Sequence, residues 1–226
     1  MSKGDVCLLE NIRFYPEEES NNLKFVNNIS KNFDLFVNDA FSASHRKHAS
    51  IVGFPKYLPS FAGYSFINEI YNINFFIKNN LKPNLAIIGG SKISTKINLL
   101  NNLIENCDVI SISGAMANTF LFAQGFDIGI SLCEKNLFKK ANSILKKAHN
   151  LNCKILLPLD VVCSNNIYDN SNVRECSINN IYKNQMILDV GSKTVKEISS
   201  YILKSKSILW NGPLGAFEYK PFEKGS

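Results

Sequence analysis

The sequence has no apolar run long enough to cross a membrane, and Gly4-Asp5 interrupts the only apolar stretch near its start that a secretory signal would need. Its six cysteines include no Cys-x-x-Cys pair, and none is spaced with histidine as a zinc ligand set. Repeats are absent, and the only compositional bias is an excess of asparagine. We therefore expect free cysteines, a reducing cytoplasm and no membrane partner.

Arginine is scarce. The only arginines among the 25 lysine and arginine residues are Arg13, Arg46 and Arg174. With 19 aspartate and glutamate residues, the net charge is +6. The lysines are scattered and are not clustered with aromatic residues, so the charge indicates a solvated surface and no nucleic-acid partner. The charge distribution does not exclude a phosphate-binding site formed by a few of these residues. With 226 residues, 45% hydrophobic and 19% charged, the chain is long enough for one large domain, or for one domain with part of another.

Short apolar runs alternate with segments of helical period, which is typical of an α/β protein with a largely parallel sheet. From Glu134 to Asn150 the apolar residues form one helical stripe, and Val195, Ile198 and Ile202 repeat that spacing. The runs that we expect to form buried strands are Val6–Leu9, Leu35–Val37, Leu85–Ile88, Val109–Ile112, Ile155–Leu159 and Ile208–Trp210.

A stripe of isoleucines predicts a helix over residues 67–80. The stripe consists of Ile67, Ile70, Ile73 and Ile77, and Pro83 ends the segment because proline disfavours helix at the residue before it. We expect this helix to join two lobes of the protein.

The segment from Gly89 to Lys96 follows an expected strand and precedes a helix. Glycines allow a phosphate to approach the backbone, and a helix N-terminus offers free N–H groups. Lys92 and Lys96 are four residues apart, so we expect them on one helical face near that end. The segment matches neither a Walker A loop nor Gly-x-Gly-x-x-Gly, and a turn with two solvated lysines is an equal alternative.

Three further segments concentrate polar residues. Residues 210–218 follow a strand and hold the only tryptophan, Asn211 and Glu218, but by themselves they favour a turn with a core tryptophan. Residues 38–48 hold Arg46 and two of the three histidines, and residues 8–14 hold Arg13. The two arginines each follow a strand and are expected to face one cleft, where guanidinium groups bind carboxylate or phosphate. For Arg46 and the histidines, a solvated loop is the alternative. An acid/base pair of Asp39 and His45 is weakly supported.

Taken together and in order, these segments closely resemble the phosphoglycerate kinase family, over essentially the whole chain. The segments that carry the resemblance are Leu9–Phe14, Glu17–Glu19, Phe36–Phe41 with His45-Arg46, Gly89–Lys92 with Lys96, Gly114–Ala117, Leu157–Asp160 and Trp210–Pro213.

The resemblance implies two lobes, each with a mainly parallel sheet flanked by helices in a Rossmann-like α/β arrangement, both incomplete here. Residues 1–66 would be the C-terminal part of the phosphoglycerate-binding lobe, 67–83 the connecting helix and linker, and 84–226 most of the nucleotide-binding lobe. Family members transfer a phosphoryl group reversibly between ATP and 3-phosphoglycerate, giving ADP and 1,3-bisphosphoglycerate. Mg²⁺ accompanies the nucleotide. A cytoplasmic monomer is implied.

The resemblance also assigns roles to residues. Arg13 and Arg46 would bind the phosphoglycerate, and Arg13 and Lys92 would stabilise the group in transfer. No residue of this chain would be a metal ligand, because the family's Asp for the metal–nucleotide lies in a segment that this sequence lacks. The nucleotide would be bound by Gly89, Gly90, Lys92, Lys96, Gly114, Asn211 and Glu218.

The sequence departs from the family pattern at Ser113, Ile187 and Ser192, and it lacks an N-terminal segment that supplies further phosphoglycerate contacts. The main hypothesis is a phosphoglycerate kinase represented by part of its chain, which we expect to be inactive alone. The alternative is a non-catalytic remnant that at most binds nucleotide through Lys96 and Glu218. An unrelated Rossmann-like binding protein is disfavoured by the order of the motifs.

Overall fold

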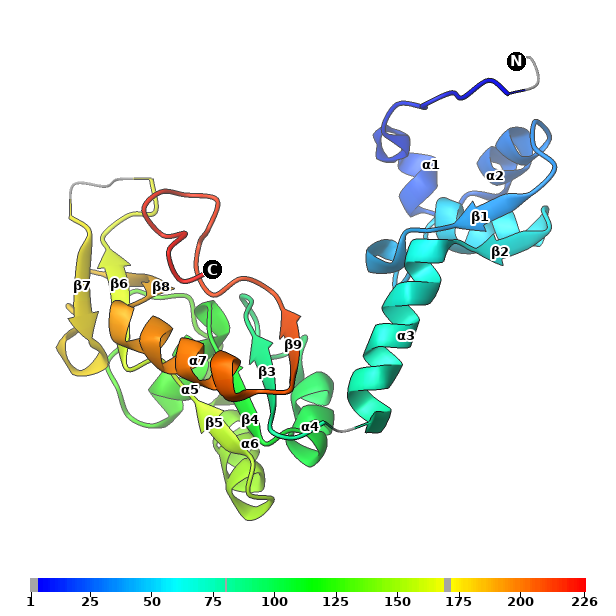
Figure 1. Cartoon of the computed structure of the whole chain (residues 1–226). Helices are drawn as coiled ribbons and strands as arrows, with labels where there is room; N and C mark the ends of the chain where they lie inside the picture. Colours follow the sequence, from blue (N-terminus) through cyan, green and yellow to red (C-terminus); the bar gives the residue numbers. More distant parts are fainter. Residues whose placement is uncertain (1–3, 80, 169–171) are drawn as a thin grey trace. The chain divides into compact units, whose positions relative to one another are not determined.

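The computed structural model describes residues 4–79, 81–168 and 172–226, and the chain divides into two compact units, residues 1–75 and 76–226 (Figure 1). The division falls inside helix α3 (Tyr64–Asn79). The lobe boundaries at residues 66 and 84 remain a prediction.

Unit 1 is built around a parallel pair of short strands, β1 (Phe36–Asn38) and β2 (Ser60–Ala62). Helix α2 (Leu23–Ser30) begins where the Asn22 side chain accepts hydrogen bonds from the backbone N–H groups of Lys24 and Phe25. Val26, Ala49 and Phe54 form its buried core. The remaining elements are α1 (Pro16–Glu19), the 3₁₀ turns η1 (Ile12–Phe14), η2 (Phe41–Ala43) and η4 (Phe54–Lys56), and the π-helical turn η3 (Ala49–Gly53).

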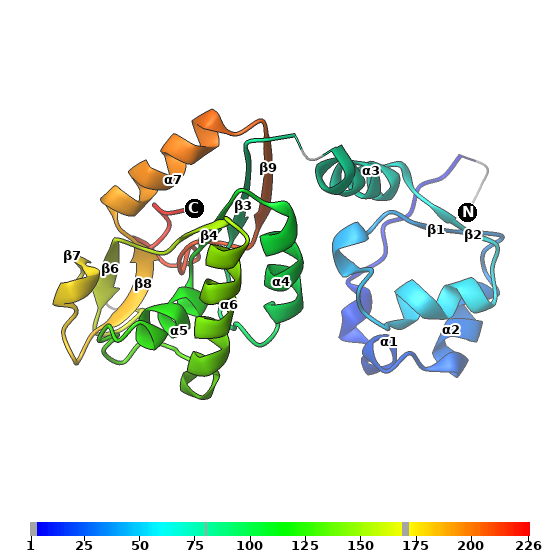
Figure 2. The ribbon, with the colours of Figure 1, turned by 90° about the horizontal axis from the view of Figure 1, so that it is seen from below.

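Unit 2 contains a four-stranded parallel sheet in the order β5-β4-β3-β9. Its strands are β3 (Asn84–Ile88), β4 (Val109–Ile112), β5 (Lys154–Leu156) and β9 (Ser207–Asn211). Figure 2 shows α7 (Ser192–Lys204) on one face of this sheet and α4 (Ile97–Asn106) and α6 (Phe138–Asn150) on the other.

Strand β3 is buried along its whole length because both faces of the sheet are covered. Ala86 and Ile88 pack in the cluster with the helices α4, α5 (Ala115–Ala123) and α6, whereas Leu85 and Ile87 pack in the cluster with α7. This explains why β3 and β4 are mostly apolar and show no alternation of buried and exposed residues. Both strands and the α/β class are confirmed.

A second sheet in unit 2 was not predicted. It is antiparallel, in the order β7-β6-β8, with strands β6 (Asp160–Ser164), β7 (Arg174–Ser177) and β8 (Met186–Val190). Its strands contain Asp160, Glu175 and Asp189, so they do not read as apolar runs. The Asp160 carboxylate accepts hydrogen bonds from the N–H groups of Lys193 and Thr194 and thereby caps α7.

The strand predicted at Val6–Leu9 is wrong. In the described part of the chain these residues form neither helix nor strand, and the side chains of Val6 and Leu8 are each 97% exposed. A strand needs a neighbour for its backbone N–H and C=O groups, and no strand of the described residues pairs with this segment.

Other boundaries move by a few residues. The strand predicted to end at Leu159 ends at Leu156, because Pro158 offers no N–H to the sheet. The helix predicted from Glu134 starts at Phe138, after the 3₁₀ turn η5 (Lys135–Leu137). The helix predicted over 67–80 runs from Tyr64 to Asn79, and residue 80 lies outside the described residues. A further turn, η6, spans Ile178–Asn180.

We expect unit 1 to be less stable than unit 2, because three buried side chains form its core whereas unit 2 has helices packed on both faces of a sheet. In hydrogen exchange, backbone amides in β1 should exchange at least about tenfold faster than those in β3 and β4. Uniform protection across both units would contradict this expectation.

Candidate functional site

Three loops meet at the carboxyl ends of β3, β4 and β9 and are joined by backbone hydrogen bonds. The N–H of Gly89 donates to Asn211 O at 2.9 Å, and that of Gly114 donates to Leu214 O at 2.9 Å. Gly90 O accepts from the N–H of Met116, also at 2.9 Å. Ligands of open α/β sheets bind at this end of the strands.

The glycines in these loops are required by close backbone approach. A Cβ on Gly89 would lie 1.8 Å from the carbonyl oxygen of Pro213, and one on Gly114 would lie 2.7 Å from that of Gly90. Gly114 also has a φ of +70°, which favours glycine. The loops therefore pack backbone against backbone.

Lys96 binds two of these loops together. Its Nζ donates to Gly89 O at 2.7 Å and to Asn211 Oδ1. Burial lowers the pKa of Lys96, because the charged form is desolvated. The structure thus brings Lys96 and Asn211 together, beside Gly89.

The expectation that Lys92 and Lys96 share a helical face is wrong. Helix α4 starts at Ile97, so Lys92 lies in the preceding turn with an exposed side chain. The neighbouring Ser94 donates its N–H and hydroxyl to Glu134 at 3.0 and 2.6 Å. Desolvation opposes ionisation of Glu134, but the hydrogen bonds from Ser94 and the charge of Lys92 outweigh it and lower the pKa of this carboxyl.

A cavity of about 400 Å³ adjoins these loops within unit 2. Gly90 and Gly114 line it, whereas Gly89, Lys92, Lys96, Asn211 and Glu218 do not. Its other walls are mostly apolar, and they come from α5, β8, the loop after β9 and three loops elsewhere in unit 2. These walls include Leu132, Pro158, Ile167, Met186, Ile187, Leu188, Val190, Pro213 and Leu214. Glu218 is exposed in the loop beyond β9.

Asn118 and Asp189 also line this cavity, and sequence reasoning missed both. The Asn118 amide donates to Leu132 O at 3.0 Å, while its Oδ1 is buried and has no hydrogen-bond partner among the described residues. Neither residue stands beside a glycine-rich turn or another titratable cluster in the sequence. Only their place on α5 and at the end of β8 brings them to the cavity.

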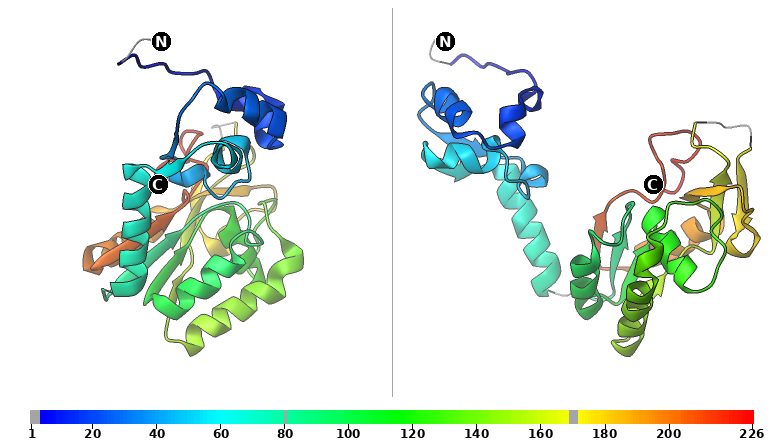
Figure 3. Two further views of the ribbon diagram at one scale, coloured as in Figure 1. Left: turned by 90° about the vertical axis from the view of Figure 1, so that its right-hand side faces the viewer. Right: turned by 180° about the vertical axis from the view of Figure 1, so that it is seen from behind.

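Asp189 holds the C-terminal segment against β8. Its carboxylate accepts from the N–H groups of Val190 and Gly225, each at 2.8 Å, and a Cβ on Gly215 would lie 2.2 Å from Oδ1. Figure 3 shows this segment in red after β9, without helix or strand. Burial is the main cause that raises the pKa of Asp189 to about 6, against the hydrogen bonds that it accepts. The Asp189 carboxylate therefore holds in place the part of the cavity wall that follows Pro213.

Unit 1 has a cavity of about 370 Å³ that is lined by both polar and apolar residues, and Arg13, Asn38, Asp39 and Glu18 are among the polar ones. The Glu18 carboxylate is buried and accepts from the N–H and hydroxyl of Ser50 at 2.9 and 2.5 Å. Arg46 is exposed and does not line the cavity. The structure therefore places only one of the two predicted arginines at this cavity.

The weakly supported pair of Asp39 and His45 is not formed in the described residues. Asp39 Oδ1 accepts from the N–H of Phe66 at 2.9 Å in the first turn of α3. That hydrogen bond is the main cause that lowers the pKa of Asp39. His48, in contrast, has its Nδ1 3.7 Å from the buried Glu18 carboxylate. The role of Asp39 in this structure is therefore to stabilise the first turn of α3.

No group of three or more His, Cys, Asp or Glu side chains within residues 4–79, 81–168 and 172–226 is arranged to hold a metal ion. No helix of the described chain is long and apolar enough to cross a membrane. The structure thus brings Lys96 and the glycine loops together beside an apolar cavity.

The parallel sheet covered on both faces, with glycine loops at its carboxyl edge, defines a doubly wound α/β protein. The chain belongs to the phosphoglycerate kinase family, whose model matches residues 1–226. The relative in Orientia tsutsugamushi strain Ikeda is 48% identical over 229 residues, and that in Bartonella tribocorum is 45% identical over 226. Both are named phosphoglycerate kinase, and the whole chain covers 56% and 57% of their lengths.

Solved structures agree. The phosphoglycerate kinase of Coxiella burnetii matches 95% of this chain at a TM-score of 0.74 and 36% identity, and the chain covers 56% of it. The Pyrococcus horikoshii enzyme matches 98% at a TM-score of 0.81 and 28% identity, with 58% covered. The chain thus spans little more than half the length of these relatives.

Replacing Gly114 by alanine should destabilise unit 2 more than replacing Gly125. Both glycines have positive φ, +70° and +91°, but a Cβ on Gly125 would meet nothing within 4 Å. The matched control Gly125→Ala isolates the backbone cost, so Gly114→Ala should cost about 1–3 kcal/mol more in urea unfolding. Equal losses would contradict the close approach of Gly114 to Gly90.

Asp189 should make stability fall as pH rises. Its pKa is raised from 3.8 to about 6 in the folded chain, so folding is favoured below the lower value and this advantage is lost as pH rises through about 6. Between pH 4 and 7 the loss should be on the order of 1–2 kcal/mol. Urea unfolding of Asp189→Asn should lack this part of the pH dependence, and identical pH profiles for both proteins would refute it.

Proposed function

We propose that this chain contributes the nucleotide-binding and part of the phosphoglycerate-binding machinery of a phosphoglycerate kinase. The reaction is the reversible transfer of a phosphoryl group between ATP and 3-phosphoglycerate, which gives ADP and 1,3-bisphosphoglycerate. The observation that carries the proposal is the meeting of the loops around Gly89, Gly114 and Asn211 with Lys96, next to an apolar cavity. The names of the relatives support it.

In this proposal the nucleotide base occupies the apolar cavity, and its phosphates lie against the glycine loops. The N-terminus of α5, directly after Gly114, offers the positive end of its helix dipole to an anion. Lys96 exchanges its bonds to Gly89 O and Asn211 Oδ1 for phosphate oxygens. Glu218 is proposed to bind the ribose, although it does not line the cavity.

Lys92 is proposed to act on the transferred group. That group carries negative charge on three oxygens, so positioning and cationic stabilisation supply most of the catalysis. Among the described residues no hydrogen bond or ion pair holds the Lys92 ammonium, and its side chain is exposed. No general base is needed, since the acceptor is already a carboxylate.

In unit 1, Arg13 is proposed to bind the phosphoglycerate at the cavity that it lines with Asn38, and Arg46 to join it there. The buried Glu18 holds Ser50 and thereby the end of the loop that carries Arg46. Guanidinium groups bind carboxylates and phosphates through two parallel hydrogen bonds.

Magnesium is proposed as the companion of the nucleotide. The described residues offer no ligand cluster for it, and the carboxylate at the cavity, Asp189, is committed to backbone N–H groups. These residues therefore do not fit a metal site of their own. We also propose a cytoplasmic monomer.

The 226-residue chain should bind ADP, and Lys96→Met should weaken that binding by about tenfold or more, since a hydrogen bond to a charged group contributes about 1.5–3 kcal/mol. The exposed Lys139 of α6 provides a matched control, and Lys139→Met should change the affinity by less than about twofold. Titration calorimetry measures both. Equal affinities for the two variants would reject the role of Lys96.

Kinase activity requires a second experiment. The chain alone should show negligible turnover in a coupled assay, whereas a chain extended with the unmatched parts of the Orientia relative should be active. In the extended enzyme Lys92→Ala should lower kcat by at least about a hundredfold with ADP affinity within about threefold, because its contribution belongs to the transition state. An inactive extended enzyme that still binds ADP would favour the non-catalytic alternative.

A further inference from the structure

A buried amide oxygen at the cavity of unit 2 has no hydrogen-bond partner among the described residues. Asn118 lies on α5, lines this cavity and is 1% exposed. Its Nδ2 donates to Leu132 O at 3.0 Å, while its Oδ1 is buried and unpaired. A carbonyl oxygen only accepts hydrogen bonds, so the amide nitrogen faces Leu132 and Oδ1 is the atom left over. A buried acceptor without a donor is costly, which points to a donor supplied by a ligand.

The other buried polar side chain of the cavity wall is already satisfied. Asp189 accepts from the N–H of Val190 at Oδ1 and from the N–H of Gly225 at Oδ2, each at 2.8 Å. Among the described side chains that line the cavity, Asn118 thus holds the one buried acceptor without a partner. A ligand in this mostly apolar cavity is therefore oriented by a single buried side-chain acceptor.

Asn118 lies one helical turn beyond the glycine loops. Gly114 is the N-cap of α5 and lines the cavity, and Asn118 follows it by four residues, which is about 6 Å along the helix axis. In the proposed function, on which this inference rests, the phosphates lie at the glycine loops and the base occupies the cavity. A base that enters from that end turns the edge opposite its sugar toward Asn118. In adenine this edge carries the amino group at C6.

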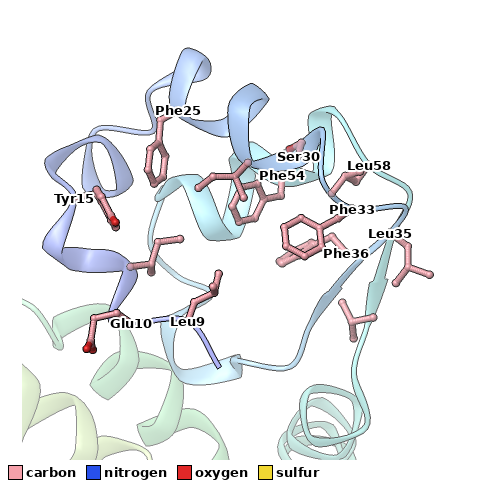
Figure 4. Close-up of a pocket in the computed structure, with 13 residues that line it drawn as sticks. Leu9, Glu10, Tyr15, Phe25, Ser30, Phe33, Leu35, Phe36, Phe54 and Leu58 are labelled. Carbon is pink, nitrogen blue, oxygen red and sulfur yellow. The ribbon is translucent and has the colours of Figure 1, made fainter. Parts of the chain in front are cut away.

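The larger apolar cavity of unit 1, of about 570 Å³, does not offer the same combination (Figure 4). Its wall contains no glycine, lysine or arginine, so it lacks groups that bind the phosphates of a nucleotide. It also shares Ile12, Phe36 and Val37 with the cavity of Arg13. Ser30 Oγ is buried and unpaired there, but a hydroxyl rotates to donate or to accept and does not select for a donor.

We propose that Asn118 recognises the nucleobase. Its Oδ1 accepts a hydrogen bond from the amino group at C6 of adenine, and Nδ2 stays on Leu132 O, which holds the acceptor in a fixed orientation. Hypoxanthine and guanine carry a carbonyl oxygen at C6, which would place two acceptors against each other. A site built around a hydrogen bond rejects an analogue that lacks the donor, because the buried partner stays unpaired. Asn118 thereby selects adenine nucleotides.

The unmodified 226-residue chain allows the first test. Titration calorimetry compares ADP with purine riboside 5′-diphosphate, which has hydrogen in place of the amino group, and with inosine 5′-diphosphate, which has a carbonyl oxygen there. ADP should bind about fivefold or more tightly than either analogue. Equal affinities for all three nucleotides would overturn this inference and leave the proposed nucleotide site intact. If a folded chain bound none of them, the proposed function would fail as well.

Asn118→Leu removes the amide at nearly constant volume. In this variant the preference for ADP over purine riboside 5′-diphosphate should fall to within about twofold, because the analogue never used Oδ1. A residue that only held Leu132 in place would predict a different result. Both affinities would then fall by the same factor and the preference for ADP would persist, which would overturn the role of Asn118 in base recognition.

Ser113→Ala is the matched control. Ser113 Oγ is also buried without a partner among the described residues, but Ser113 does not line the cavity. This variant should keep the preference for ADP within about twofold of the unmodified chain. Equal loss of the preference in both variants would also overturn the inference. Circular dichroism and urea unfolding report whether each variant folds, and the comparison of nucleotides on the unmodified chain decides the question even if Asn118→Leu does not.

Discussion

The structure of unit 2 depends on the contact of three backbones at the carboxyl ends of β3, β4 and β9. A Cβ on Gly89 or Gly114 would collide with main-chain atoms of the neighbouring loop, so no larger residue fits without movement of the strands themselves. This contact places the Lys96 ammonium at one edge of the sheet, where it donates to Gly89 O and Asn211 Oδ1. The phosphate site that we propose lies there, because a positive charge stands where the backbone can be approached closely.

The two units differ in how far their apolar surface is covered. In unit 2, helices lie on both faces of the parallel sheet, and every residue of β3 and β4 is buried. In unit 1 a two-stranded sheet stands next to an open apolar cavity. The difference explains why strands of similar sequence behave differently: Leu85–Ile88 is paired on both sides, whereas Val6–Leu9 has no partner strand in the described chain.

Sequence patterns predicted helices and strands best where the burial of side chains follows a regular pattern along the element. The apolar runs of β3 and β4 were found because both faces of these strands are buried, and the stripes of α6 and α7 because one face of each helix is buried. The antiparallel sheet was missed because its strands carry acidic residues, among them Asp160 and Asp189, whose partners are backbone N–H groups distant in sequence. The shared helical face of Lys92 and Lys96 failed because α4 begins one residue beyond Lys96.

The sequence by itself determined the α/β class, the family, and which glycines and lysines are candidates for binding phosphate. These follow from local periodicity and from motifs contiguous in the chain. Only the tertiary structure decided which of these residues meet. It joined Lys96 to Asn211 across 115 positions, placed Asn118 and Asp189 at the cavity and left Arg46 away from the cavity of Arg13. The physical reason is that hydrogen bonds and close packing between distant segments have no local signature, whereas periodicity has one.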